Sequence, residues 1–179
     1  RKTEMQKSKR IKQIFLIFTL LVNFCLFSIN VFGRDGQSSL KGEKYALLIG
    51  INDYANIKDL KYCEDDVALF QESIIKYLDV KKENCKVIVG SNATKSGLIA
   101  GFNWLAKKVQ SGDGMVFYFS GHGAQVKDLE DDETDGLDEL LCLYDIYPGR
   151  RQTYLLDDEV SELLGKVNTQ DKLIVLDCC

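Results

Sequence analysis

The side chains best suited to covalent chemistry are a single histidine and a pair of adjacent cysteines. His122 is the only histidine of the chain and stands between two glycines in the stretch FYFSGHGAQ, residues 117–125. Cys178 and Cys179 directly follow the apolar stretch KLIVLD, residues 172–177. A thiol with a pKa of about 8.5 is mostly protonated at neutral pH, and an adjacent imidazole can remove its proton. These residue types therefore suit nucleophilic catalysis by a cysteine.

Whether these groups can meet depends on the elements that carry them. Short apolar runs predict buried strands, and apolar residues at helical spacing predict helices between them. The predicted strands are residues 44–51, 85–90, 114–120 and 172–177, and the predicted helices are residues 65–78 and the stretch after Thr94, which is expected to cap it. Alternating strands and helices are typical of an α/β fold, a parallel sheet with helices on both faces.

His122 and Cys179 follow the last two predicted strands, at the edge where ligands of parallel sheets bind. Residues two apart along a strand point the same way, so His122 shares its direction with Ser120, and Cys179 with Asp177. If these strands are neighbours, they lie about 5 Å apart, and the imidazole can face the Cys179 thiol. The backbone N–H of Gly123 could then bind a developing oxyanion.

An ordinary structural role is the alternative for each of these residues. A histidine between glycines is often a loop residue without a function, and cysteines commonly pack as small apolar side chains. We favour the catalytic interpretation because His122 and Cys179 are expected together at the ends of adjacent strands.

Composition and charge limit the classes of partner. Hydrophobic residues make up 45% of the 179 and charged residues 28%, which indicates a globular domain rather than a disordered chain. The formal net charge is −4, and it becomes more negative without the basic N-terminal residues. An acidic domain disfavours nucleic acid as a partner and permits cationic ones such as metal ions or basic peptides.

The first 33 residues differ in kind from the rest. Residues 1–13 are basic, and residues 14–32 are apolar and carry no charge. This pattern predicts a secretory signal with cleavage before Arg34, and a retained membrane anchor is the rival interpretation. We therefore expect an exported or membrane-anchored protein, in which only an uncleaved segment 14–32 contacts the membrane. Residues 34–43 are predicted to be a polar linker.

The spacing of the cysteines argues against a zinc site. No zinc pattern matches it, and a single histidine cannot complete one. Cleavage of the N-terminal segment would remove Cys25 and leave five of the six cysteines. An odd number in an exported protein implies at least one free thiol. After Cys25 in the N-terminal segment, the cysteines are Cys63, Cys85, Cys142, Cys178 and Cys179.

The motif FYFSGHGAQ, followed later by VLDCC, resembles the caspase-like cysteine peptidases, and most of all the metacaspases and their bacterial relatives, the orthocaspases. The likeness covers nearly everything from residue 44 to residue 179, and it includes ALLIGINDY, LKYCEDDV, DDETDGLDELLCLYD and LLDDEV in the family's order. It implies a three-layer caspase-like (caspase–hemoglobinase) fold over residues 44–179, with a mainly parallel sheet flanked by helices. It also implies His122 as the base, Cys179 as the nucleophile, and no cofactor for the chemistry.

The resemblance also implies specificity, because metacaspases cut polypeptides after Arg or Lys. The family positions that line the corresponding pocket match Cys63, Asp66, Ser120 and Asp177. Asp66 and Asp177 are chemically suitable, since a buried guanidinium needs carboxylate partners. The alternative for Asp66 is a purely structural role in the acidic first turn of a helix, where it would interact favourably with the dipole.

An acidic stretch raises the question of calcium. Residues 128–139 hold eight carboxylates, which usually form a solvated loop, and their spacing is not that of an EF-hand. In many metacaspases calcium binds through residues that correspond to Asp138, Asp157 and Asp158. The resemblance therefore makes Ca²⁺ a candidate activator.

The sequence as a whole predicts a cysteine endopeptidase with a His–Cys dyad. The alternative from another class is a non-catalytic caspase-like module that acts in binding or regulation. The later strands and part of the substrate cleft of the resembled fold would follow residue 179. We therefore expect the 179 residues alone to be inactive.

Overall fold

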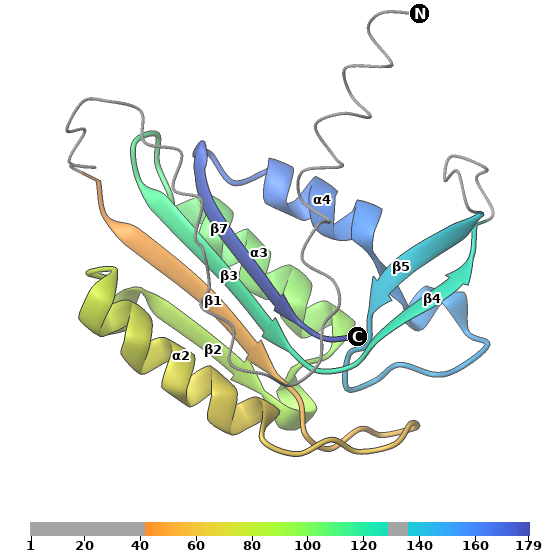
Figure 1. The fold of residues 1–179 in the computed structure, drawn as a ribbon. Helices are drawn as coiled ribbons and strands as arrows, with labels where there is room; N and C mark the ends of the chain where they lie inside the picture. Colours follow the sequence, from red (N-terminus) through yellow and green to blue (C-terminus); the bar gives the residue numbers. More distant parts are fainter. Residues whose placement is uncertain (1–41, 129–135) are drawn as a thin grey trace, which may run out of the picture. The chain divides into compact units, whose positions relative to one another are not determined.

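Four parallel strands form the central sheet, in the order β2–β1–β3–β7 (Figure 1). The computed structural model describes residues 42–128 and 136–179. All three strand pairings are parallel, so the predicted α/β class with a parallel sheet is confirmed. The strands are β1 (Lys44–Gly50), β2 (Cys85–Val89), β3 (Gly114–Ser120) and β7 (Asp171–Asp177).

Helices cover both faces of this sheet, as the sequence predicted (Figure 1). Alternate residues of a strand point to opposite faces, and Leu47 and Phe117 pack with one cluster whereas Leu48 and Tyr118 pack with the other. Every residue of β3 is buried, which explains its continuous apolar run. The first cluster receives residues of α3 (Lys95–Lys108) and α4 (Asp157–Gly165), and the second receives residues of α2 (Cys63–Tyr77).

The two predicted helices are confirmed, with small differences at their ends. Thr94 caps α3, because its side chain accepts a hydrogen bond from the Gly97 N–H at 3.1 Å. α2 begins two residues earlier than predicted, after Tyr62 in a left-handed conformation with φ of 74°. Three short 3₁₀ helices join the elements, at Lys82–Asn84, Gly90–Asn92 and Arg151–Thr153.

A second, antiparallel sheet was not predicted. Its order is β4–β5–β6, and it leaves the central sheet shortly after β3 (Figure 1). Its strands lack the long apolar runs that identified the others: β4 is largely exposed, and β6 has only two residues. The strands are β4 (Gly123–Lys127), β5 (Leu137–Leu141) and β6 (Leu155–Leu156).

Several predictions concern residues outside the described ranges. The signal or anchor at residues 1–33, most of the linker at 34–43, and the acidic residues 129–135 lie there. Within the described part of the chain, none of the helices has the length and apolarity needed to cross a membrane.

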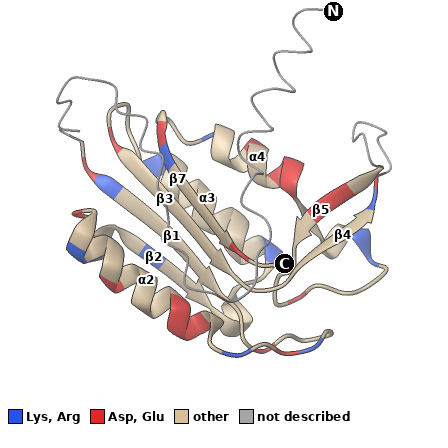
Figure 2. Ribbon diagram, in the orientation of Figure 1, with Lys and Arg blue, Asp and Glu red and all other residues tan. Residues whose placement is uncertain are grey.

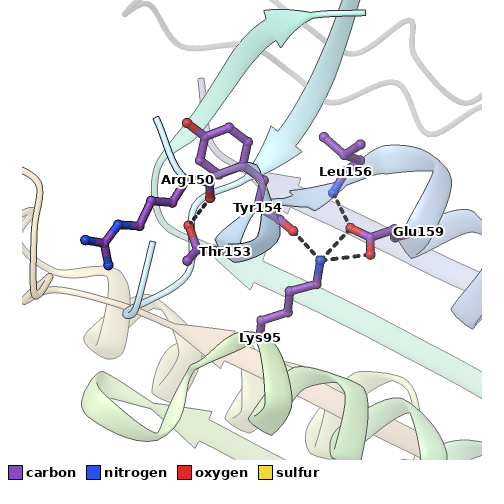
Figure 3. Close-up of polar contacts among 6 residues, drawn as sticks. All are labelled: Lys95, Arg150, Thr153, Tyr154, Leu156 and Glu159. Carbon is purple, nitrogen blue, oxygen red and sulfur yellow. Dashed lines mark hydrogen bonds and ion pairs between the residues drawn. The ribbon is translucent and has the colours of Figure 1, made fainter. Parts of the chain in front are cut away.

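Lys95, at the start of α3, links this helix to α4 and to the segment that precedes α4 (Figure 3). Its ammonium group donates to the Tyr154 carbonyl oxygen at 2.5 Å and to both carboxylate oxygens of Glu159 at 2.8 and 2.9 Å. Glu159 also accepts from the Leu156 N–H at 3.1 Å. One lysine therefore neutralises the carboxylate and fixes the entry to α4.

This arrangement predicts a measurable stability difference between two lysines. Lys95→Met should lower the free energy of unfolding by about 1–2 kcal/mol, because it leaves a partly buried carboxylate and a carbonyl without their donor. Lys166→Met is the matched control: its ion pair with Glu162 is exposed, and its loss should leave the free energy of unfolding nearly unchanged. Urea unfolding of both variants measures the two values, and equal losses would contradict this role of Lys95.

Candidate active site

The segments that follow β3 and β7 meet at one edge of the sheet. The two strands are neighbours, and Ser120 is paired with Asp177 in their register. The contact continues one step further, because the Gly121 N–H donates to the Asp177 carbonyl oxygen at 3.2 Å. The strand adjacency on which the predicted dyad depended is therefore present.

The loop that carries His122 also lies against the two cysteines. A Cβ atom added at Gly123 would overlap the carbonyl oxygen of Cys179 and would lie 3.3 Å from Cys178 Sγ. Only glycine leaves room for this approach, and any larger residue would push the cysteine segment away. Gly123, the predicted oxyanion donor, is thus in direct contact with the residue predicted to be the nucleophile.

The imidazole of His122 is held by the loop that follows β1. Its Nε2 lies 3.0 Å from the Lys58 carbonyl oxygen, and the two rings of His122 and Tyr54 have centroids 5.2 Å apart. A carbonyl only accepts, so Nε2 must carry the proton, and Nδ1 is the basic atom of the neutral ring. Over residues 42–128 and 136–179, no hydrogen bond joins the imidazole to the Cys179 thiol.

Three thiols near this edge have different surroundings. Cys179 is exposed, Cys178 is half-buried against the core of the α3 face, and Cys142 is buried there. Burial raises the pKa of Cys178 to about 11, and the nearby Cys179 and Asp177 add to the shift. Burial likewise raises the pKa of Cys142 to about 11. Of these three thiols, only that of Cys179 belongs to an exposed residue.

The four residues expected to line a specificity pocket lie close together. Cys63 starts α2, and Asp66 lies in its first turn, while Ser120 and Asp177 end β3 and β7. Burial raises the pKa of Cys63, the Ser120 hydroxyl opposes the shift, and the carboxylates of Asp66 and Asp177 add to it. Figure 2 shows acidic residues at the start of α2 and at the end of β7. The structure thus gathers two carboxylates on the α2 side of the edge.

Tyr118 belongs to the same cluster, although sequence reasoning missed it. Its hydroxyl donates to Asp177 Oδ2 at 3.3 Å, and its ring stacks on Phe70 with centroids 4.2 Å apart. Burial raises the pKa of Tyr118 to about 12, and Asp177 adds to the shift, so the phenol stays neutral. Its position two residues before Ser120 places it on the same strand face, which is the sequence signal that could have identified it.

A hollow of about 340 Å³ borders His122 and Gly123. Its lining is largely apolar and includes Ile57, Leu140 and Ile146. The imidazole therefore has an apolar concave surface beside it, of a kind that can hold a substrate side chain.

Asp138, one of the three candidate calcium ligands, is held by an arginine. It is 7% exposed, and its Oδ2 lies 2.5 Å from Arg151 Nη2. Arg151 Nη1 also donates to the Lys127 carbonyl oxygen at 3.0 Å. The positive charge beside this carboxylate is thus supplied by the chain itself.

The other two candidates, Asp157 and Asp158, stand at the start of α4. Burial raises the pKa of Asp157 to about 6, and the carboxylates of Asp158 and Glu139 add to the shift. Among the described residues, no three His, Cys, Asp or Glu side chains are grouped as metal ligands. Among the described residues, Arg151 therefore supplies the positive charge beside Asp138.

The chain is similar in sequence to metacaspases. The sequence model of the metacaspase, peptidase C14 domain matches residues 44–179. Metacaspase-1B of Neurospora crassa is 32% identical over 133 residues, which are 71% of this chain and 30% of that protein. Metacaspase-1 of Yarrowia lipolytica is 34% identical over 135 residues, 72% of this chain and 29% of that protein. The chain thus spans less than a third of the length of these two relatives.

A solved structure supports the same relationship. A crystal structure of a Geobacter sulfurreducens protein superposes with a TM-score of 0.60 and 28% identity, over 76% of this chain and 50% of that one. The residues that the family's sequence model matches, 44–179, include the histidine and the cysteine pair at this edge. By the match of the family's sequence model over most of its length, the chain belongs to the metacaspase family of cysteine peptidases.

Proposed function

We propose that the full-length protein is a cysteine endopeptidase in which His122 and Cys179 form the catalytic dyad. The observation that supports it most is the parallel pairing of β3 with β7, which leads the histidine loop and the cysteines to one edge. Cys179 is the exposed thiol there, whereas burial raises the pKa of Cys178 and keeps it protonated.

The proposed reaction follows from these groups. Nδ1 of His122 takes the proton of the Cys179 thiol, and the thiolate attacks the scissile carbonyl carbon. The Gly123 N–H stabilises the oxyanion of the tetrahedral intermediate. The imidazolium returns the proton to the leaving amine, which departs and leaves a thioester on Cys179. Water, deprotonated by the imidazole, then hydrolyses the thioester and releases the new carboxylate.

We propose that the substrate residue before the cleaved bond is Arg or Lys. The two carboxylates of Asp66 and Asp177 beside Cys63 and Ser120 support this specificity, because a desolvated cation needs negative partners. The Tyr118 hydroxyl holds one carboxylate oxygen of Asp177 and leaves the other to a guanidinium.

The test of the function uses the full-length protein with peptides that end in Arg, Lys or Asp. Cleavage is expected after Arg and Lys, and Cys179→Ala should lower it at least about a thousandfold. Cys178→Ala is the matched control and should stay near wild type, since a thiol with a pKa of about 11 has only about a thousandth of its population as thiolate at pH 8. Activity that survives Cys179→Ala but vanishes in Cys178→Ala would overturn the assignment.

Specificity is tested by removing one charge. Asp177→Asn should lower kcat/KM for an Arg peptide about 30-fold and should have a much smaller effect on a citrulline peptide, which has the same shape without the charge. Asp171→Asn, at the other end of β7, is the control and should change neither value. An unchanged ratio of Arg to citrulline cleavage in Asp177→Asn would exclude Asp177 from the pocket.

We propose that Ca²⁺ takes no part in the chemical steps and that Arg151 occupies the place of a cation at Asp138. Thermal unfolding in millimolar Ca²⁺ should then leave the Tm of the wild-type protein unchanged. Arg151→Gln frees the Asp138 carboxylate, so its Tm should rise on addition of Ca²⁺. A larger rise in the wild type than in Arg151→Gln would contradict this interpretation.

A further inference from the structure

Tyr54 contacts both the backbone and the ring of His122. The phenol oxygen accepts a hydrogen bond from the His122 N–H at 2.8 Å, and the two rings are inclined by 45° with centroids 5.2 Å apart. Tyr54 is only 8% exposed and packs within the core of the α3 face. The contact is therefore shielded from water, which cannot readily replace the phenol as acceptor.

The position of Tyr54 is itself fixed by its neighbours. Its N–H donates to Asp59 Oδ1 at 2.8 Å, and the next residue, Ala55, donates its N–H to the Tyr144 carbonyl oxygen at 3.1 Å. Burial raises the pKa of the Tyr54 phenol well above its usual range, so the group stays neutral. The same loop supplies the Lys58 carbonyl to Nε2 of His122. The short loop that holds Tyr54 and Lys58 thus forms hydrogen bonds with both the backbone and the ring of His122.

The absence of a side chain at Gly121 leaves room for the Tyr54 phenol beside the His122 N–H. A Cβ atom at this position would lie 2.7 Å from the Tyr54 phenol oxygen and 2.9 Å from Phe119 Cζ. Any side chain there would push the phenol away from the His122 N–H. The glycine that precedes the histidine is therefore required by the tyrosine and not only by the turn.

We propose that Tyr54 is a positioning residue for the catalytic base: it fixes residue 122 so that the imidazole is presented to Cys179. The inference rests on the proposed dyad. The phenol oxygen determines where the backbone of residue 122 lies, the ring limits the tilt of the imidazole, and the Lys58 carbonyl fixes which nitrogen carries the proton. An imidazole held in one orientation spends most of its time in the productive conformation. This raises kcat, whereas it has little effect on substrate affinity.

The experiment compares Tyr54→Phe with Tyr45→Phe in the full-length protein. Tyr54→Phe keeps the ring and removes the acceptor, so kcat should fall about tenfold while KM changes less than about twofold. The acid limb of the kcat/KM profile should move to higher pH, toward that of an unassisted thiol. Tyr45 lies near the start of β1 and packs edge-on against Trp104, and its variant should keep the wild-type values.

A second variant tests the steric argument and guards against misfolding. Gly121→Ala should lower kcat by displacing the phenol, and its effect should be smaller in the Tyr54→Phe background, where the oxygen that it strikes is absent. If the effects of Gly121→Ala and Tyr54→Phe on kcat are fully additive, the steric coupling between the two residues is wrong. The positioning role is also wrong if the fall in kcat of Tyr54→Phe equals the fraction of that variant that is unfolded while its pH profile is unchanged. If His122→Ala retains activity, the proposed dyad is wrong. If His122→Ala is inactive but Tyr54→Phe has wild-type kcat and pH profile, only the positioning role of Tyr54 is wrong.

Discussion

The pairing of β3 with β7 is the constraint on which the rest of the site depends. Seven successive residue pairs join the two strands, from Gly114 with Asp171 to Ser120 with Asp177. This register fixes which residues leave the sheet side by side. A shift of one residue would exchange the faces of all side chains on β7, turning Ile174 and Leu176 toward the α2 side. The burial of Ile174 and Leu176 against the α3 face opposes such a shift.

The two adjacent thiols that follow β7 have different surroundings. Cys178 continues the row of core-facing residues, so its thiol is desolvated and its pKa is raised. Cys179, the next residue, is exposed. The carboxylates of Asp66 and Asp177 beside Cys63 lie at the same edge of the sheet.

The elements with strong local patterns could be predicted, and those built from short or polar segments could not. KYALLIG and GMVFYFS are long buried runs and gave correct strands, and Thr94 marked the start of α3. The strand GAQVK has mostly exposed residues, and the two residues of β6 are too few for any period. In the site, residue type identified the histidine and the cysteines. The contribution of Lys58 is a backbone carbonyl, which no residue type encodes, and Tyr54 is tied to His122 only by the tertiary fold.

The proposed catalysis requires His122 and Cys179 to act as a unit at the β3–β7 edge. The most direct measurement is the rate of Cys179 alkylation by iodoacetamide between pH 5 and 10, in the full-length protein and in His122→Ala. An imidazole beside the sulfur predicts rapid alkylation near neutral pH that His122→Ala delays until the pH approaches the ordinary thiol pKa of about 8.5. Superimposable curves for the two proteins would contradict it, because the thiol would then ionise without regard to the histidine.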